Sequence, residues 1–361
     1  MKPKVKKGQI WERKKDGYRI FIHKGKGDEW KSQCLNNKKS HHIITFDLHK
    51  YWKLIETEQK MRHFIYVPFT GLGLYGGHRG SRWLKNRIKI FKQFVVPSLL
   101  AQTNQNFTIW ISWRPEDRGN LAITELYLDL VRMFGEERVA FSYSGVCFWD
   151  DKYEDALAHD RLATALHGSF RDIINYVGDV KHVLMTIQPS DDCYHKDMVQ
   201  EMQNVFKETD LQAVGFKHGY IMNYQTKELR EYNPKTNPPF FTIKFPRETF
   251  LDPLAHMKYT GPYKSHEYIG EKLNYKQFDA RGFLVGTHGE NISTHFKHPY
   301  AGELIPITEL NNFGILNVPN LKINYSIRKQ ILRKLPHRVQ RKLRYIFGEK
   351  IYQTIYNYLR S

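Results

Sequence analysis

Cysteine is scarce in this chain of 361 residues, and long apolar runs are missing. Its three cysteines, Cys34, Cys147 and Cys193, are far apart and odd in number. This usage does not suit a disulfide framework or a zinc site and favours a reducing cytoplasm. No stretch approaches the roughly 20 apolar residues that a membrane-spanning helix needs. Residues 1–7 carry lysines without an apolar segment behind them, so no secretory signal is predicted.

Basic residues outnumber acidic ones at both ends of the chain. Residues 1–60 contain 16 Lys or Arg against 7 Asp or Glu, a net charge of +9, and residues 322–361 contain 11 against 1, a net +10. The segment between them is neutral, so the total of +19 belongs to the two flanks. Basic flanks suit an anionic membrane surface or nucleic acid, and the alternative is a solvated face that only aids solubility.

The hydrophobic patterns divide the chain into three parts. Residues 1–57 hold short aromatic and β-branched runs separated by turn residues, which predicts a small β-rich basic domain. In residues 61–305 apolar strands alternate with helical patterns, so we expect an α/β domain with a mostly parallel central sheet and a ligand at the carboxyl ends of its strands. Its first helical pattern starts near Ser81 and is expected to break at Pro97. Residues 321–361 alternate basic and apolar positions as an amphipathic helical tail does.

A pair of carboxylates follows the last apolar strand of this pattern. Residues 182–188 form a run of strand length, Pro189 ends it, and Ser190, Asp191 and Asp192 come next. Adjacent carboxylates repel each other unless a cation lies beside them, and hard oxygen ligands suit Mg²⁺ or Mn²⁺, which in turn can hold a diphosphate. The alternative is an Asp-rich turn that caps the next helix. The spacing by itself leaves both interpretations open.

Several further segments resemble a known family. Residues 97–107 read Pro-Ser-Leu-Leu-Ala-Gln-Thr-Asn-Gln-Asn-Phe and precede a strand with two tryptophans. Together with residues 190–192, 261–268 and 287–293, they make residues 61–305 similar to the rhamnosyltransferase family. Members of that family are glycosyltransferases with a GT-A-like fold that use a nucleotide-sugar donor. Ser190 stands where the family motif has its first carboxylate.

The resemblance implies roles for particular residues. Asp191 and Asp192 would form the metal and nucleotide-diphosphate site, with Ser190 beside the nucleotide and His288 completing the binding of Mn²⁺ or Mg²⁺. Glu267 would be the base of an inverting transfer, with His266 second in rank. The alternatives are a helix-start acid for Glu267 and an ordinary loop histidine for His288.

Two arginines next to the glycine-rich segment 71–80 complete the set of expected site residues. Arg79 and Arg82 are expected to contact phosphate or base, and the alternative for both is a solvent-facing position.

Two classes of function follow from these patterns. The first is a cytoplasmic, metal-dependent glycosyltransferase at the inner face of the membrane, with a glycan or glycolipid acceptor; only the family resemblance suggests rhamnose. The second is a nucleic-acid-binding or interaction protein with a non-catalytic α/β scaffold, supported by the basic, aromatic ends. The neutral centre and the carboxylate pair argue against nucleic acid.

Overall fold

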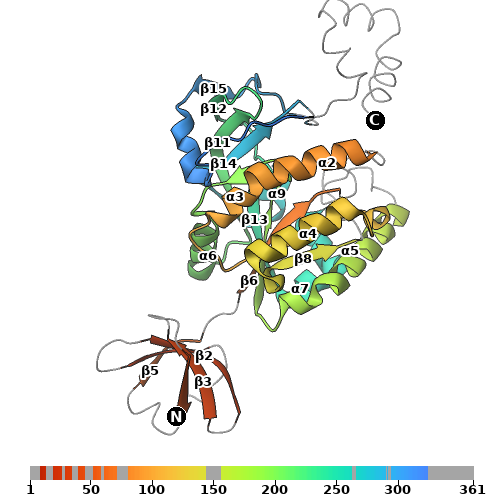
Figure 1. Cartoon of the computed structure of the whole chain (residues 1–361). Coiled ribbons are helices and arrows are strands. Elements are labelled where there is room, and N and C mark those ends of the chain that lie inside the picture. The colour runs from red at the N-terminus through yellow and green to blue at the C-terminus, as the bar shows by residue number, and fades with distance from the viewer. Residues whose placement is uncertain are drawn as a thin grey trace, which may run out of the picture. The chain divides into compact units, whose positions relative to one another are not determined.

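The computed structural model divides the chain into two units, which are considered separately (Figure 1). One contains Met1–Arg62 with Val177–Val183, and the other contains His63–Tyr176 with Leu184–Ser361. The structure describes the strands of the N-terminal unit and residues 61–70, 80–143, 156–261, 266–289, 291 and 294–323. No helix among these residues is long and apolar enough to cross a bilayer.

The N-terminal unit contains a five-stranded antiparallel sheet with the strand order β4-β3-β2-β1-β5. Its strands are β1 Gln9–Arg13, β2 Arg19–Lys26, β3 Glu29–Cys34, β4 Ser40–Ile44 and β5 Trp52–Thr57. These strands agree with the short aromatic and β-branched runs of residues 1–57. The assignment of residues 1–57 as a domain of its own stays a prediction.

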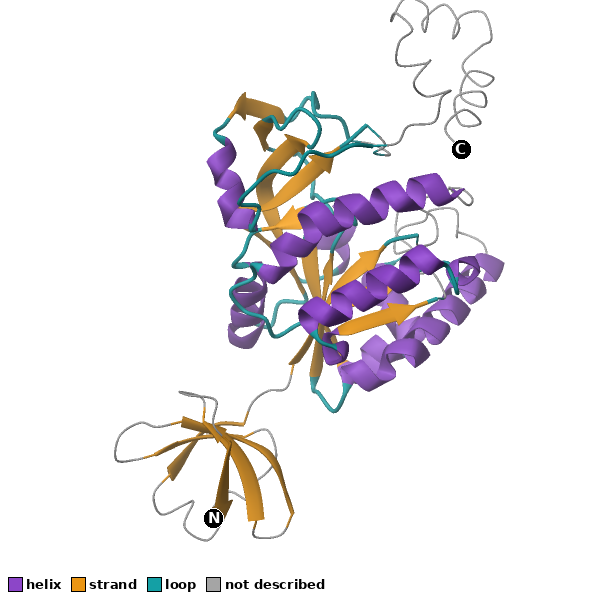
Figure 2. Ribbon diagram, in the orientation of Figure 1, coloured by secondary structure: helices purple, strands orange, loops and turns teal. Residues whose placement is uncertain are grey.

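A ten-stranded sheet forms the centre of the larger unit, and helices lie along it (Figure 2). Its main order is β10-β14-β11-β13-β9-β6-β7-β8, and β12 joins β11 to β15. The strands are β6 Met61–Pro68, β7 Thr108–Ser112, β8 Val139–Ser142, β9 His182–Ile187, β10 Cys193–Tyr194, β11 Ala213–Asn223, β12 Leu229–Tyr232, β13 Phe241–Pro246, β14 Tyr275–Thr287 and β15 Ala301–Leu304.

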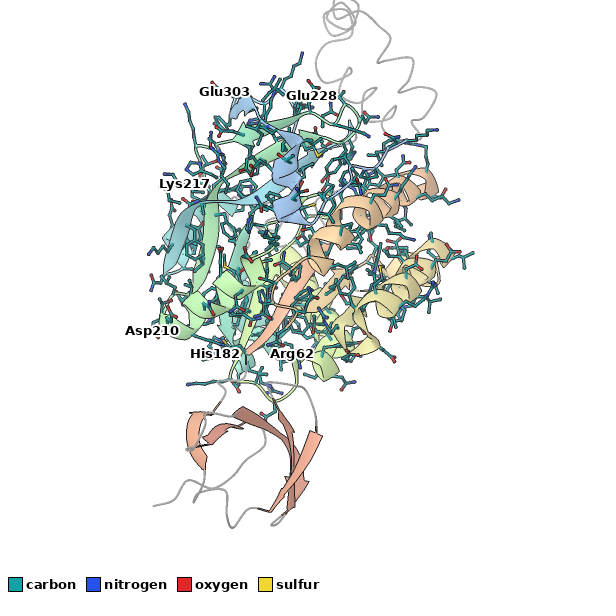
Figure 3. All side chains as sticks on the ribbon, turned by 60° about the vertical axis from the view of Figure 1, so that its left-hand side comes forward. Arg62, His182, Asp210, Lys217, Glu228 and Glu303 are labelled. Atoms are coloured by element: carbon teal, nitrogen blue, oxygen red, sulfur yellow. The ribbon has the colours of Figure 1, made fainter. Side chains whose placement is uncertain are left out.

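The sheet combines parallel and antiparallel pairs. β6, β7 and β8 run parallel to one another, and β11 is parallel to β14, as alternating strands and helices predict. Antiparallel pairs join β10 to β14, β13 to β11, and β12 to both β11 and β15. Figure 3 shows Glu228 and Glu303 at the end of the unit where β12 and β15 pair.

The helices of this unit connect and cover the strands. They are α2 Gly80–Ile90, α3 Val96–Leu100, α4 Leu121–Phe134, α5 Ala156–Val177, α6 Met198–Glu208, α7 Arg247–Leu251, α8 Pro253–Thr260 and α9 Ile269–Lys272. Shorter turns are the π-helix η2 Phe91–Val95 and the 3₁₀ helices η3 Pro115–Asp117, η4 Glu136–Arg138, η6 His266–Tyr268 and η7 Ile307–Phe313.

The first helical segment continues past Pro97, contrary to the expectation that it breaks there. The π-helix η2 lies between α2 and α3, and Pro97 falls in the first turn of α3. Pro97 lacks the N–H that would bond back to the preceding turn, and that turn is the π-helix η2, where the Val96 N–H bonds to the Phe91 carbonyl and the regular α-helical bonding is already interrupted. The segment from Gly80 to Leu100 is therefore helical throughout.

The segment from Leu310 to Ile323 packs onto η2 and the central sheet. Leu310, Phe313, Leu321 and Ile323 are buried in a cluster with Phe94 and other residues of η2, β10, β11 and β14. Residues 321–323 are not helical, and Leu321 and Ile323 belong to this core. The remainder of the predicted basic tail, residues 324–361, lies outside the described residues.

Candidate functional site

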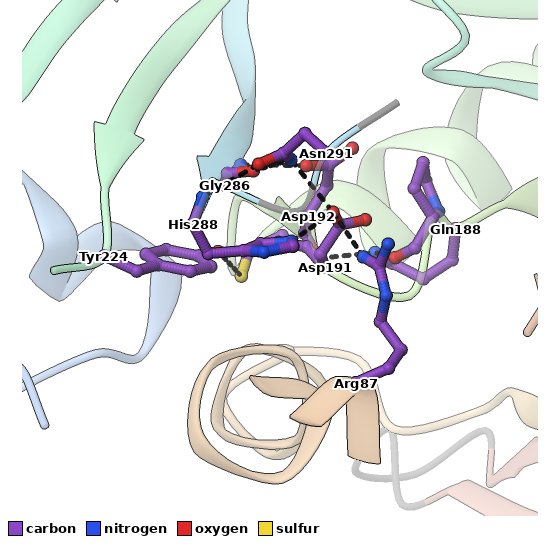
Figure 4. Close-up of polar contacts among 10 residues, drawn as sticks. Arg87, Gln188, Asp191, Asp192, Tyr224, Gly286, His288 and Asn291 are labelled. Carbon is purple, nitrogen blue, oxygen red and sulfur yellow. Dashed lines mark hydrogen bonds and ion pairs between the residues drawn. The ribbon is translucent and has the colours of Figure 1, made fainter. Parts of the chain in front are cut away.

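Arg87 is a charged side chain on the buried face of α2. It is 2% exposed and lies among Trp83, Leu84 and Ile88, with its guanidinium 5.3 Å from the centre of the Trp83 ring. A buried guanidinium needs a counter-ion because burial without one is costly. Its Nη1 forms an ion pair with Oδ2 of Asp191. Helix α2 is thereby joined to the predicted carboxylate pair (Figure 4).

Asp191 is surrounded by donors from three parts of the chain. Besides Arg87, its Oδ2 accepts hydrogen bonds from His288 Nε2 at 3.0 Å and from Asn291 Nδ2 at 3.1 Å. The hydroxyl of Tyr224 donates to its backbone oxygen at 2.8 Å. Burial by itself raises the pKa of Asp191, but the positive charge of Arg87 and the bond from His288 outweigh it and hold the pKa far below its usual value. Asp191 is therefore a fixed carboxylate anion.

Asp192 has a different environment although it is the next residue. Its Oδ1 accepts the backbone N–H of Gly286 at 2.8 Å, and its backbone oxygen accepts from Gln188 Nε2 at 2.7 Å. A side chain at Gly286 would collide with the Asp191 carbonyl and the Tyr224 ring, so only glycine permits this approach. Burial, and then the charge of Asp191, raise the pKa of Asp192 well above its usual value. Asp192 is therefore favoured in its protonated, neutral form.

The Pro-Ser-Leu-Leu-Ala-Gln-Thr segment supports the chain that follows the carboxylates. Ser98 Oγ donates to the Tyr194 carbonyl at 2.8 Å, and Gln102 Nε2 donates to the His195 carbonyl at 2.9 Å. Gln102 Oε1 in turn accepts the Val199 N–H at 3.1 Å, at the start of α6. Ser98 and Gln102 are both buried, and their bonds satisfy buried backbone groups of residues 194–199. The motif thus holds the carboxylate loop in place.

A second polar cluster lies at the same edge of the sheet. The hydroxyl of Thr70, beyond β6, donates to Asp117 Oδ2 at 2.6 Å and accepts the Arg114 N–H at 2.9 Å. Arg114 Nε also donates to the Thr70 carbonyl at 3.0 Å. The Gln188 N–H donates to Tyr66 O at 2.8 Å, which places the end of β9 beside the end of β6. Carboxyl ends of neighbouring strands are where ligands bind in open α/β sheets.

The three further residues predicted to bind the nucleotide differ in their surroundings. Ser190 is 4% exposed and directly precedes the carboxylates. Arg82 is half-buried in the first turn of α2. Arg79 lies outside the described residues. The roles of all three stay predictions.

The predicted base and its neighbour lie on η6 and are anchored to the loop before β13. Glu267 is exposed, and its Oε1 accepts the Thr236 hydroxyl at 2.7 Å. His266 Nδ1 lies 2.7 Å from the Asn237 carbonyl, which can only accept, so this nitrogen carries a proton. Burial lowers the pKa of His266 despite this bond. The structure brings His288 together with Asp191, whereas His266 and Glu267 make these contacts with residues 236–237.

The charges of the site bear on whether a divalent cation fits. Among the described residues, no group of three or more His, Cys, Asp or Glu side chains is arranged to hold a metal. Asp191 Oδ2 is already shared by Arg87, His288 and Asn291. Burial and the neighbouring charge of Asp191 favour the protonated form of Asp192. The binding of Mn²⁺ or Mg²⁺ by Asp191, Asp192 and His288 therefore stays a prediction.

Sequence reasoning missed four residues that build the site, namely Arg87, Tyr224, Gly286 and Asn291. Arg87 had a signal, because a lone arginine on an otherwise apolar helix face requires a buried acid. Asn291 lies in the segment 287–293 that already supported the resemblance. Tyr224 and Gly286 had no local signal, since each contacts the carboxylates only through the pairing of β11, β14 and β10.

Comparisons with known proteins bear on this arrangement. Residues 80–117 match the family model described as "Putative rhamnosyl transferase". The matched segment runs from α2 to η3 and contains Arg87, Ser98, Gln102, Arg114 and Asp117, so it supplies both the ion pair to Asp191 and the second polar cluster. The resemblance to a family of rhamnosyltransferase-like glycosyltransferases is confirmed in this segment. A comparison with curated proteins found no match.

Solved structures with similarity to the chain include S. aureus TarS 1–349, at 13% identity with a TM-score of 0.35, covering 63% of this chain and 60% of TarS 1–349. Another is TarS 1–349 in complex with UDP-GlcNAc, at 13% identity and a TM-score of 0.35, covering 66% and 62% respectively. The chain thus spans about six tenths of the length of these proteins. Similarity at this level does not establish a shared function.

Proposed function

We propose that this chain is a glycosyltransferase that moves a sugar from a nucleotide-activated donor to a glycan or glycolipid acceptor, with rhamnose as the first candidate sugar. The observation that carries the proposal is the buried ion pair between Arg87 and Asp191. It joins the family-matched segment to the carboxylate pair that the sequence marks at a strand end. The proposal is therefore supported by the contact between the family-matched segment and the carboxylate pair.

The residues around Asp191 suit the nucleotide-diphosphate end of the donor. Arg87, His288 and Asn291 hold one carboxylate oxygen in a single orientation, which is the preorganisation that positioning a substrate requires. Asp192 and His288 would hold Mn²⁺ or Mg²⁺. Such an ion, when bound, supplies positive charge to a departing diphosphate. Arg82 and Arg79 remain candidates for contact with the phosphates or base.

The acceptor side of the reaction needs a base in an inverting transfer. We assign this role to Glu267, because an exposed carboxylate can take the proton of an acceptor hydroxyl. The Thr236 hydroxyl donates to Glu267 Oε1 and thereby restricts its orientation. His266 is the second candidate.

The basic tail suits an enzyme that works at an anionic, cytoplasmic membrane surface. Residues 322–361 carry a net +10, and basic residues near such a surface contribute about 1 kcal/mol each. A lipid-linked glycan acceptor would be held at this surface.

The test is consumption of nucleotide sugars by the full-length protein, with and without Mn²⁺. A panel of donors that includes a rhamnose nucleotide is incubated without acceptor, and release of the nucleotide is measured. Asp192→Asn keeps an acceptor for the Gly286 N–H but cannot ionise to bind a cation, and Asp192→Ala removes the acceptor as well. Both are expected to lose donor turnover while remaining folded.

The matched control is Asp279→Asn, which changes a carboxylate with 80% exposure and should behave as wild type. Wild-type turnover by the Asp192 variants would refute the site. Failure of the native protein to consume any donor would refute the proposed activity, and full activity without a divalent ion would refute the metal.

A further inference from the structure

A cluster of half-buried aromatic side chains lies where β12 and β15 meet. The ring of His298 is 5.5 Å from that of Tyr232 and 4.9 Å from that of Tyr300. The Asn233 N–H donates to the Tyr300 carbonyl at 3.0 Å, which holds the two strand ends together. The site described above uses none of the three rings.

The cluster belongs to a continuous aromatic row on one face of the sheet. Tyr232 packs edge-on against Phe283 at 6.3 Å, and Phe283 stacks on Phe240 at 4.1 Å. Gly219 pairs with both Tyr232 and Phe283, and a side chain there would collide with the Phe283 ring. The row is therefore possible only because glycine leaves this position of β11 open.

The same cluster lies close to both halves of the proposed active site. Phe283, on which Tyr232 packs, pairs with Tyr194 of β10, two residues after Asp192, and the Tyr194 ring also packs on Phe240 at 5.7 Å. The loop that begins after Tyr232 reaches Thr236 and Asn237, which bind Glu267 and His266. Tyr232 is therefore linked through Phe283 to the strand after Asp192, and through the loop that follows it to the proposed base Glu267.

We infer that Tyr232, His298 and Tyr300 form the subsite for the acceptor, and that its ligand is a carbohydrate ring. Aromatic rings that keep part of their surface exposed present apolar faces together with a polar edge, as the alternating C–H and hydroxyl groups of a sugar require. The rings are linked to Glu267 through the loop 233–237, which binds it, and to β10 after Asp192 through Phe283. This inference rests on the proposed function, because it names the second substrate of the same site.

Binding is tested first, without any need for turnover. Saturation-transfer NMR is recorded on the full-length protein with a panel of methyl glycosides that includes methyl α-L-rhamnoside and methyl β-D-glucoside. Wild type should bind at least one glycoside, and Tyr232→Ala and His298→Ala should each weaken that binding roughly tenfold, the loss expected when an aromatic contact is removed. Tyr232→Phe, which keeps the ring, should retain most of it.

Tyr259→Ala is the matched control, because Tyr259 is another half-buried tyrosine that packs on Phe245 of β13. It should leave glycoside binding unchanged. Each variant is checked by circular dichroism, and His298→Ala decides the matter if Tyr232→Ala does not fold. Absence of glycoside binding in wild type, or unchanged binding in both Tyr232→Ala and His298→Ala, would overturn the inference.

The second measurement compares transfer to the best-bound glycoside with hydrolysis of the donor. Tyr232→Ala should lower transfer relative to hydrolysis by about tenfold. If no donor is consumed but glycoside binding depends on Tyr232 and His298, the proposed transferase fails and the carbohydrate subsite stands. If donor is consumed and glycoside binding is unchanged in the Tyr232 and His298 variants, the proposed transferase activity is supported and the proposed acceptor subsite is refuted.

Discussion

Replacing Arg87 with methionine should destabilise the protein far more than an ordinary surface substitution. The side chain of Arg87 is 2% exposed and that of Asp191 is 12% exposed, so the change leaves a buried carboxylate without its main counter-ion. Removing one member of a buried pair costs about 3–5 kcal/mol, because the other charge remains desolvated. The double variant Arg87→Met/Asp191→Asn should recover much of this loss, since neither charge remains.

The control is another basic residue of the same helical segment. Lys92 Nζ pairs with Asp129 Oδ2 at 2.5 Å, but the Lys92 side chain is 43% exposed. Lys92→Met should therefore cost no more than about 1 kcal/mol. Urea unfolding followed by circular dichroism measures all four proteins, and the midpoint of Arg87→Met should fall by more than about 1 M. A loss as small as that of Lys92→Met would refute the buried ion pair.

The pH dependence supplies a second check on the same pair. Arg87 keeps the pKa of Asp191 below its unfolded value, so the stabilising effect is present above that value and is lost as the pH falls. Without Arg87, burial raises the pKa of Asp191. Protonation of Asp191 as the pH falls then removes the free-energy cost of burying its unpaired charge. The gap in unfolding free energy between wild type and Arg87→Met should thus narrow in acid. A gap that is constant from pH 7 to pH 4 would contradict this account.

Three further predictions concern other parts of the molecule. Glu267→Gln should lower transfer by about 10²–10⁴-fold with donor affinity nearly unchanged; an equal loss of donor binding would place Glu267 in the nucleotide pocket, and retained transfer would favour His266. Deleting residues 324–361 should weaken sedimentation with anionic vesicles at low salt without stopping transfer to a soluble acceptor, and equal sedimentation of both proteins would refute the membrane role. His63 and His256 have pKa values lowered to about 3 by burial, so each should destabilise the fold by about 2 kcal/mol at pH 5, where the unfolded histidine is protonated. His63→Gln should reduce the drop in urea midpoint between pH 7 and pH 5, and an unchanged drop would show that His63 is not buried in its neutral form.

The tail deletion has to begin after Ile323 for a structural reason. Leu321 and Ile323 are buried against the helix–sheet core, and the Lys322 carbonyl accepts a hydrogen bond from Lys89 Nζ at 3.0 Å. A cut at residue 322 would remove core contacts and confuse loss of the membrane role with unfolding. The charge that the prediction depends on lies almost wholly beyond this point.

Local pattern was sufficient to locate the strands that lead to the site. The run at residues 182–188, which the sequence marks as a strand, is found as β9, and β6, β7 and β8 are apolar runs of the same kind, because a strand buried on both faces has a nearly continuous series of apolar residues. The placement of Asp191 and Asp192 after such a strand, at a sheet edge, follows from the same run and from Pro189. The resemblance at residues 97–107 also has a local basis, since its polar residues are those that bind backbone groups.

Tertiary structure alone decided which side chains meet at that edge. Arg87, His288 and Asn291 come from segments about 100 residues away from Asp191, and no periodicity specifies which buried cation will pair with which carboxylate. The strands β10 and β15 likewise depend on antiparallel pairing with the distant strands β14 and β12 rather than on local propensity. The opposite pKa shifts of Asp191 and Asp192 show the consequence: the two neighbours are chemically alike in the chain, and their surroundings make one an anion and hold the proton on the other.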